Sequence, residues 1–199
     1  MPALSEIETV LAQFGRQDDG AFDPVECALL LSALDHPGTD LGAARKHFSD
    51  LAGAGAARAH LPPARALGEV VAGLYGYRGD RQTYDDMKNA DLLSVIERRK
   101  GLPVALAVPY LAAARGLDTK LVGLAFPGHF LMRIEGARER TIIDPFNDGR
   151  EIGAGQLRRL IKQLQGAQAE LQPAFFEPVS ARAVLIRLLM NSRLRAERS

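Results

Sequence analysis

The chain has 199 residues, of which 47% are hydrophobic and 25% are charged, and this length and composition suit one well-packed soluble domain. Its formal net charge of +1 argues against a dedicated nucleic-acid-binding protein, and no apolar run approaches the roughly 20 residues that cross a bilayer. Its single cysteine, Cys27, excludes an internal disulfide and a cysteine-based zinc cluster, so we expect a cytoplasmic protein without a metal, a cofactor or a membrane partner.

Residues 1–75 are expected to form successive helices, which we take as an N-terminal helical subdomain. Asp23 followed by Pro24 is a typical helix start, because the carboxylate accepts a bond from a free backbone N–H and proline suits the first turn. The stretch from residue 51 to 57 is dominated by small residues, including Gly53 and Gly55, and this predicts close helix packing.

From residue 76 the pattern changes, and we take residues 76–199 as a core that forms one compact unit with the N-terminal helices. Turn formers dominate residues 76–89, and a short helix then ends in a basic run at 98–100, with Gly101 just past its end. Pro103 begins an almost wholly apolar helix, which predicts a helix buried on all sides.

Three short runs with strand character follow the buried helix, at residues 120–124, 129–134 and 140–144. The last two are expected to form a hairpin. The predicted pairing puts His129 opposite Asp144, Leu131 opposite Ile142 and Arg133 opposite Arg140. With two further helices near the C-terminus, the sequence predicts an α+β fold: a helical N-terminal half, a central buried helix on a small antiparallel sheet, and C-terminal helices.

Of the four histidines, His129 has the context of a functional residue. The other three, His36, His47 and His60, lie in a turn or on helical segments and are interpreted as structural. His129 faces a carboxylate in the predicted pairing, which fixes the imidazole tautomer and makes the ring a better proton acceptor. The alternative is a buried hydrogen bond that only orders the hairpin.

Five ordered blocks of sequence resemble the bacterial SirB family, and the resemblance extends over residues 25–195. The blocks read GYRGDRQTYDDMKN (76–89), RRKGLPVAL (98–106), YLAAARG (110–116), GLAFPGHFL (123–131) and IDPFNDG (143–149). Tyr84, Asp86 and Asn89 match the family, whereas Asp85, Met87 and Ala90 stand where Tyr, Pro and Ser are expected. Members carry a transglutaminase-like domain that is often followed by tetratricopeptide-type repeats, and we expect a short version without these repeats.

The resemblance implies a transglutaminase-like or papain-like core, whose active members use a Cys–His–Asp triad. His129 and Asp144 occupy the second and third positions of that triad. The nucleophile position falls on Pro103, and no residue from 101 to 106 has a nucleophilic side chain. Since removal of a triad nucleophile lowers turnover on the order of a millionfold, the resemblance implies a domain without covalent catalysis.

We therefore expect a non-catalytic module that binds a protein or a peptide or has a regulatory role. Its binding residues are expected to be Tyr84, Asn89, Pro103, Gly128 and Phe130, around the His129–Asp144 pair. Cys27 is not expected to replace the missing nucleophile, because it joins the apolar stripe of a helix. The alternative is a hydrolase or amidase in which His129 activates water as a general base, with Asn89 or Tyr84 hydrogen-bonding an oxyanion.

The C-terminal segment is rich in arginine: Arg182, Arg187, Arg193, Arg195 and Arg198. We interpret these residues as the solvated side of an amphipathic helix. The alternative is a surface for an acidic partner or a nucleic acid.

Overall fold

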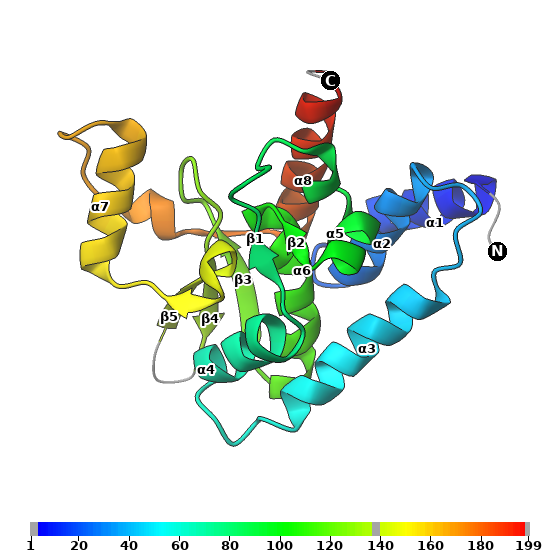
Figure 1. The fold of residues 1–199 in the computed structure, drawn as a ribbon, viewed down its shortest axis with the longest axis horizontal. Helices are drawn as coiled ribbons and strands as arrows, with labels where there is room; N and C mark the ends of the chain where they lie inside the picture. Colours follow the sequence, from blue (N-terminus) through cyan, green and yellow to red (C-terminus); the bar gives the residue numbers. More distant parts are fainter. Residues whose placement is uncertain (1–3, 137–139, 198–199) are drawn as a thin grey trace.

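The computed structural model describes residues 4–136 and 140–197, and it has the predicted α+β fold (Figure 1). The helices at the N-terminal side come first along the chain, a central helix and the sheet follow, and two helices come last. The α-helices are α1 (Leu4–Arg16), α2 (Pro24–Leu34), α3 (Gly42–Ala56), α4 (Pro63–Gly68), α5 (Leu92–Arg98), α6 (Pro103–Ala114), α7 (Ala154–Gln165) and α8 (Ala181–Ala196). None of the helices in the described residues is long and apolar enough to cross a membrane.

The main sheet is antiparallel and has the strand order β6-β5-β4-β3-β7. Its strands are β3 (Lys120–Leu124), β4 (Met132–Glu135), β5 (Arg140–Asp144), β6 (Arg150–Glu151) and β7 (Pro178–Val179). A separate parallel pair consists of β1 (Arg78–Gly79) and β2 (Lys100–Gly101). This pair holds the loop before α5 against the start of α6, and it thereby contributes to the candidate site.

Local sequence signals explain several of the helix ends. The Asp23 carboxylate accepts hydrogen bonds from the backbone N–H groups of Val25 (2.9 Å) and Glu26 (3.2 Å), as its position before Pro24 predicts. At α8, the hydroxyl of Ser180 accepts a bond from the Ala183 N–H at 3.1 Å. The fourth helix is α-helical only to Gly68, and a π-helical turn (Glu69–Leu74) continues it.

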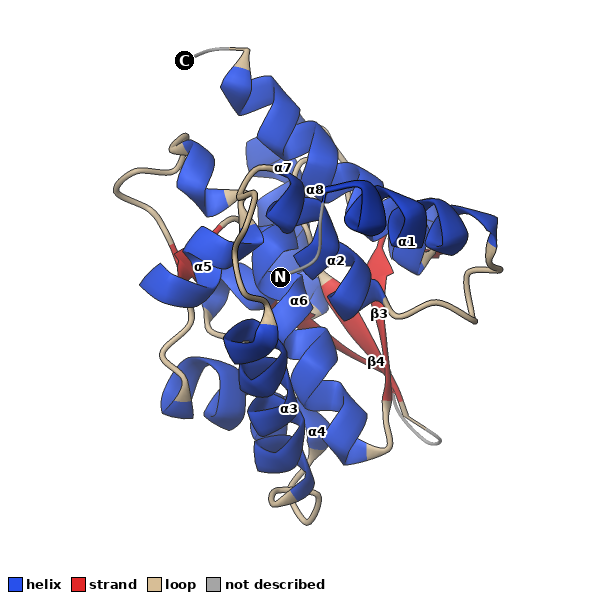
Figure 2. Cartoon of the chain, turned by 90° about the vertical axis from the view of Figure 1, so that its right-hand side faces the viewer, coloured by secondary structure: helices blue, strands red, loops and turns tan. Residues whose placement is uncertain are grey.

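Helix α6 is the centre of the fold, and Figure 2 shows it between the N-terminal helices and the sheet. Eleven of its twelve residues are buried, as its apolar sequence predicts. Helix α3 packs against it at a very short separation, because a Cβ at Gly55 would lie 2.3 Å from the Ala113 carbonyl oxygen. A Cβ at Gly116 would lie 2.0 Å from the Ala52 oxygen. The small residues of this region therefore do permit close helix packing.

The hairpin of β4 and β5 forms, but the predicted register was wrong by two residues. In the structure Ile142 pairs with Arg133, whereas the prediction paired it with Leu131. Likewise, Arg140 pairs with Glu135, whereas the prediction paired it with Arg133. His129 lies outside the strand, because Gly128 has φ +71° and turns the chain, so β4 begins only at Met132. A shift of two residues keeps each side chain on its predicted face, since side chains alternate with a period of two.

The end of α5 also differs from the prediction. Arg99, and not Gly101, takes the left-handed conformation that ends the helix, with φ 57°. Gly101 instead enters β2, where a Cβ would lie 2.9 Å from the Val95 side chain. Position 101 therefore needs a glycine because of this close contact with Val95, and not because it ends the helix.

Two glycines of α3 give a matched test of the α3–α6 contact. We expect Gly55→Ala to lower the free energy of unfolding by about 1–3 kcal/mol, because the new methyl group overlaps backbone atoms of α6. Gly53→Ala, whose Cβ meets nothing within 4 Å, should raise it by about 0.5–1 kcal/mol by lowering the entropy of the unfolded chain. Urea unfolding of both variants checks this, and equal effects at the two positions would contradict the packing.

Candidate functional site

The Asp144 carboxylate lies at the end of β5 and is saturated with hydrogen-bond donors. Its Oδ1 accepts from the backbone N–H groups of Phe146 (2.9 Å) and Asn147 (3.3 Å), at the start of the 3-10 turn Pro145–Asn147. Its Oδ2 accepts from the Asn147 side-chain amide at 2.6 Å and contacts His129 Nε2 at 2.9 Å. The side chain is only 6% exposed. The predicted contact between His129 and Asp144 is therefore present, despite the different register.

The surroundings of Asp144 determine its charge and the tautomer of His129. Burial alone raises the pKa of Asp144, but the hydrogen bonds from His129, Asn147 and the Phe146 N–H outweigh it and lower the pKa below its ordinary value. Because an ionised carboxylate only accepts hydrogen bonds, His129 donates through Nε2–H. In the neutral ring Nδ1 keeps its lone pair, and the side chain is 16% exposed. This arrangement can accept a proton or a hydrogen bond from a ligand.

Phe146 connects His129 to the loop that precedes α5. The His129 and Phe146 rings meet edge to face, with centroids 6.3 Å apart and an angle of 89°. The Tyr84 ring meets Phe146 in the same way at 5.8 Å, and the Arg81 guanidinium lies 5.3 Å from the Phe146 centroid. Gly79 lies against the same ring, since a Cβ there would be 2.5 Å from a ring carbon. Arg81, Phe146 and Asn147 were not predicted as site residues, although all three lie in blocks that carry the family resemblance.

Polar contacts inside residues 80–89 fix this loop next to α6. The Asp80 carboxylate accepts bonds from the Thr83 hydroxyl (2.6 Å) and from Arg98 (3.0 Å). Asn89 is fully buried; its side-chain amide donates to the Thr83 carbonyl at 2.5 Å, and its Oδ1 accepts from Arg98 at 3.1 Å. Its backbone carbonyl accepts from the Leu102 N–H at 2.9 Å. The polar groups of Asn89 are therefore all engaged within the protein. Tyr84, in contrast, is 43% exposed and available to a ligand.

The start of α6 lies beside this arrangement and carries no nucleophile. Gly101 pairs with Gly79, the residue that packs on Phe146, and Pro103 is buried at the first position of the helix. Residues 101–106 all have side chains without a nucleophilic group. The first position of this helix thus offers a pyrrolidine ring and no thiol.

Cys27 does not compensate for this. Burial raises the pKa of its thiol to about 11, so it is protonated at neutral pH and is a poor nucleophile. The charged groups that act on it are Arg182, Asp23 and Glu26. Among the described residues, the hydrogen bond of the His129 ring is with Asp144 and its aromatic contact is with Phe146.

The other two predicted binding residues flank His129 in the chain. Gly128 is exposed and its positive φ redirects the chain, which delivers His129 to Asp144. Phe130 is buried, with its ring close to Gly123 of β3 and under the guanidinium of Arg187, whose central carbon is 5.4 Å from the ring centroid. Phe130 is therefore a packing residue beside the site and does not itself face a ligand. Its contact with Arg187 was not predicted.

Several other polar residues that the sequence singles out have structural partners. Asp86 and Asp91 cap the helical segments that follow them, through the N–H groups of Lys88 (2.9 Å) and Ser94 (3.1 Å). His36 binds Asp91 at 3.0 Å, and His47 lies 2.8 Å from the Tyr77 hydroxyl. Within residues 4–136 and 140–197, no group of three or more His, Cys, Asp or Glu side chains is placed to hold a metal ion.

The fold and the site together define the class of protein. A central helix, an antiparallel sheet and a His–Asp pair that joins the segment before β4 to the end of β5 are what a transglutaminase-like domain provides. The family model of the transglutaminase-like superfamily matches residues 40–190, and the chain belongs to this superfamily.

Several curated proteins are similar to this chain. A UPF0162 protein of Vibrio cholerae is 32% identical over 191 residues, which are 92% of this chain and 70% of that protein. A UPF0162 protein of Xylella fastidiosa is 39% identical over 119 residues, but the match spans only 42% of that relative's length. Human F-box only protein 21 is 29% identical over 134 residues, 20% of its length. No solved structure matches the chain significantly.

The charge of Asp144 gives a test that depends on pH. We expect Asp144→Asn to lower the free energy of unfolding by about 2–4 kcal/mol at pH 7, because an amide cannot accept four hydrogen bonds and its NH₂ opposes neighbouring donors. The lowered pKa means that the carboxylate stabilises the fold above about pH 4, its ordinary range, and loses this effect as the pH falls through the folded-state pKa. The deficit of the variant should therefore shrink at pH 3 in urea unfolding.

Asp148→Asn is the matched control, since Asp148 is 40% exposed and meets Arg150 only at 3.8 Å. It should change stability by less than about 0.5 kcal/mol at either pH. A deficit of Asp144→Asn that is as large at pH 3 as at pH 7 would show that the charge is not what stabilises this site.

Restoring a thiol tests whether Pro103 occupies the nucleophile position. In a Cys27→Ala background, Pro103→Cys places a thiol at the first position of a buried twelve-residue helix, where the helix N-terminus lowers a thiol pKa. We expect alkylation by iodoacetamide at pH 6 to be at least tenfold faster than that of Cys27 in the wild type. Adding His129→Ala should slow it, and a rate indifferent to His129 would place Pro103 outside the triad position.

Proposed function

We propose that this chain is a SirB-type transglutaminase-like domain of the cytoplasm that has lost covalent catalysis and binds a protein or peptide. The observation that carries the proposal is the combination of an ordered His129–Asp144 pair with a proline at the start of the adjacent helix. The 2.9 Å contact between His129 Nε2 and Asp144 supports the proposal because it orients the imidazole, while residues 101–106 offer no sulfur to accept an acyl group. Without that sulfur no thioester forms, and turnover by this route falls on the order of a millionfold.

The surroundings of the pair support a binding role. Tyr84 and Arg81 are exposed, rest on a fixed aromatic ring and belong to a loop that internal hydrogen bonds hold in place. A preorganised surface of this kind binds with a smaller loss of conformational entropy. The similarity to one fifth of F-box only protein 21 adds to this, because it indicates that such a domain also occurs as one part of a longer chain.

A hydrolase without a covalent intermediate is the second candidate. It is favoured by Nδ1 of His129, which has no hydrogen-bond partner among the described residues and could act as a general base toward water. Such an enzyme also needs a donor for the oxyanion. The side-chain amide of Asn89 is already engaged with backbone carbonyl groups of its own loop. Tyr84 remains as the available donor, so this candidate is the weaker one.

A comparison of wild type with His129→Ala separates the two candidates. We expect both proteins to show the same background rates with peptidyl p-nitroanilides, with p-nitrophenyl acetate and in the transfer of fluorescent cadaverine to casein. Equal rates follow from the missing nucleophile. Turnover by the wild type that is lost in His129→Ala, and also in Tyr84→Phe, would overturn the proposal and establish the hydrolase.

A further inference from the structure

The arginines of α8 differ in how their charges are compensated. Arg182 binds Asp19 at 3.1 Å, and Arg193 binds Glu197 at 2.8 Å. Arg195 is 8% exposed and lies 3.6 Å from Asp85. These three have carboxylate partners. The interpretation of the whole segment as a solvated face is therefore wrong for Arg195, and Arg187 also departs from it.

Arg187 is half-buried and has no carboxylate partner among the described residues. Its guanidinium stacks on Phe130, and the one titratable group that acts on it is Tyr84. Burial lowers the pKa of Arg187, which reflects a charge that is partly removed from water without compensation. A buried charge of this kind costs stability unless something pairs with it. Apart from the stacking on Phe130, no described side chain compensates this charge, which leaves the guanidinium able to pair with an added carboxylate.

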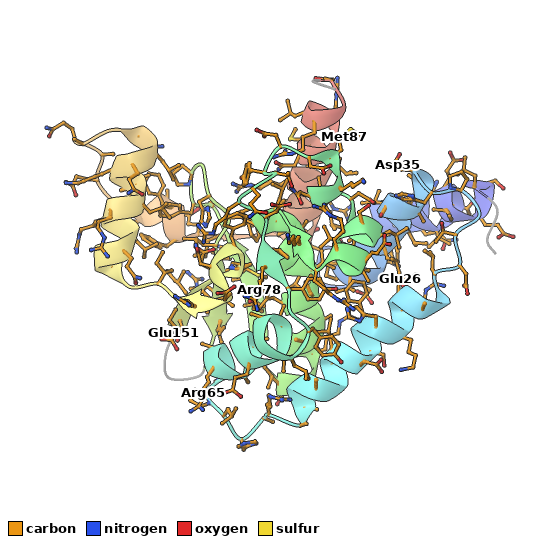
Figure 3. The ribbon with its side chains drawn as sticks, viewed as in Figure 1. Glu26, Asp35, Arg65, Arg78, Met87 and Glu151 are labelled. Carbon is orange, nitrogen blue, oxygen red and sulfur yellow. The ribbon has the colours of Figure 1, made fainter. Side chains whose placement is uncertain are left out.

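The position of Arg187 links this charge to the candidate site. Phe130, on which it stacks, directly follows His129. On the other side, Tyr84 lies between Phe146 and the Arg195 guanidinium, which is 5.6 Å from the Tyr84 ring centroid. The Nε of Arg195 is buried and has no hydrogen-bond partner within the described residues. In Figure 3 Met87, from the same loop as Tyr84, lies beside α8, so the loop and the helix border one surface.

We propose that Arg187 binds a carboxylate of the peptide that lies against Tyr84 and His129, so that the ligand of this domain is an acidic peptide. This inference rests on the proposed function and adds the chemistry of the ligand. The planar guanidinium presents parallel N–H donors that match a carboxylate, and such charge-assisted pairs are stronger than neutral ones. The carboxylate comes either from the C-terminus of the peptide or from an Asp or Glu side chain.

A nucleic acid fits this surface less well. Asp85 is 80% exposed beside Tyr84, and the net charge of the chain is only +1. A polyphosphate backbone that passed over Tyr84 would meet this carboxylate and would find few cations along its path. A single carboxylate, by contrast, needs one guanidinium and can leave Asp85 in water.

The test uses an array of random dodecapeptides, each present with a free C-terminus and with a C-terminal amide. We expect the wild type to select peptides that carry a carboxylate, and the two formats show whether it is the terminal or a side-chain one. For the selected peptides, Arg187→Gln should raise Kd at least tenfold. Arg193→Gln removes the same charge from an exposed position of the same helix and should change Kd by less than twofold.

A stability measurement distinguishes a binding role from a structural one. Arg187→Met removes the uncompensated charge and keeps an unbranched apolar side chain over Phe130, so its melting temperature should not fall below that of the wild type. If Arg187 only held Phe130 in place, the melting temperature would fall and the binding of acidic and neutral peptides would weaken equally. That result would overturn the inference.

The outcomes separate the inference from the proposed function. Peptide binding without preference for a carboxylate, or equal losses in Arg187→Gln and Arg193→Gln, overturns the role of Arg187 and leaves a peptide-binding module. If the folded wild type binds no peptide in either format, the proposed function itself fails. Displacement of bound peptides by a random single-stranded DNA oligonucleotide at equal concentration would assign the surface to nucleic acid.

Discussion

The site depends on one buried carboxylate that must stay ionised. Asp144 lies where desolvation alone would favour its neutral form, and four donors from His129, Asn147 and the following turn reverse that preference. The backbone positions these donors. The turn after β5 places two N–H groups and the Asn147 side chain next to the carboxylate, and the positive φ of Gly128 turns the chain so that His129 reaches it. Because the charge is fixed, the tautomer of His129 is fixed too, and with it the atom that a ligand meets.

The apolar centre of the fold makes this precision possible. Helix α6 has no polar side chain that could compete for Asp144, apart from the Tyr110 hydroxyl, which is buried without a hydrogen-bond partner in the described structure. The glycines at its contact with α3 bring the backbones so close that the helix has little freedom to shift. The sheet on one side and the loop of residues 80–89 on the other are thus positioned by one rigid element.

The sequence predicted the elements of this site better than their relative placement. Strands at 120–124 and 140–144, the buried helix from Pro103 and the Asp23 cap follow from local patterns, and the structure contains them. The register failed because alternation alone does not show that Gly128 interrupts the strand, yet the shift of two residues left the His129–Asp144 contact intact. The roles of Phe146 and Arg187 could not be predicted this way, since they depend on contacts with Tyr84 and Phe130, which lie more than fifty positions away in the chain.

The His–Asp pair is present although the scaffold lacks its nucleophile, and this needs an explanation. A contribution to stability is a weak explanation, because replacing a buried polar network with apolar groups is often neutral or favourable. The same argument applies to Arg187, whose half-buried charge has no partner in the described chain. Both features are related to the exposed ring of Tyr84: His129 through the Phe146 ring that both contact, and Arg187 through the electrostatic effect of Tyr84 on its guanidinium. A ligand that hydrogen-bonds to Nδ1 of His129 and pairs with Arg187 would engage both groups at once, which ties the two features to a single function.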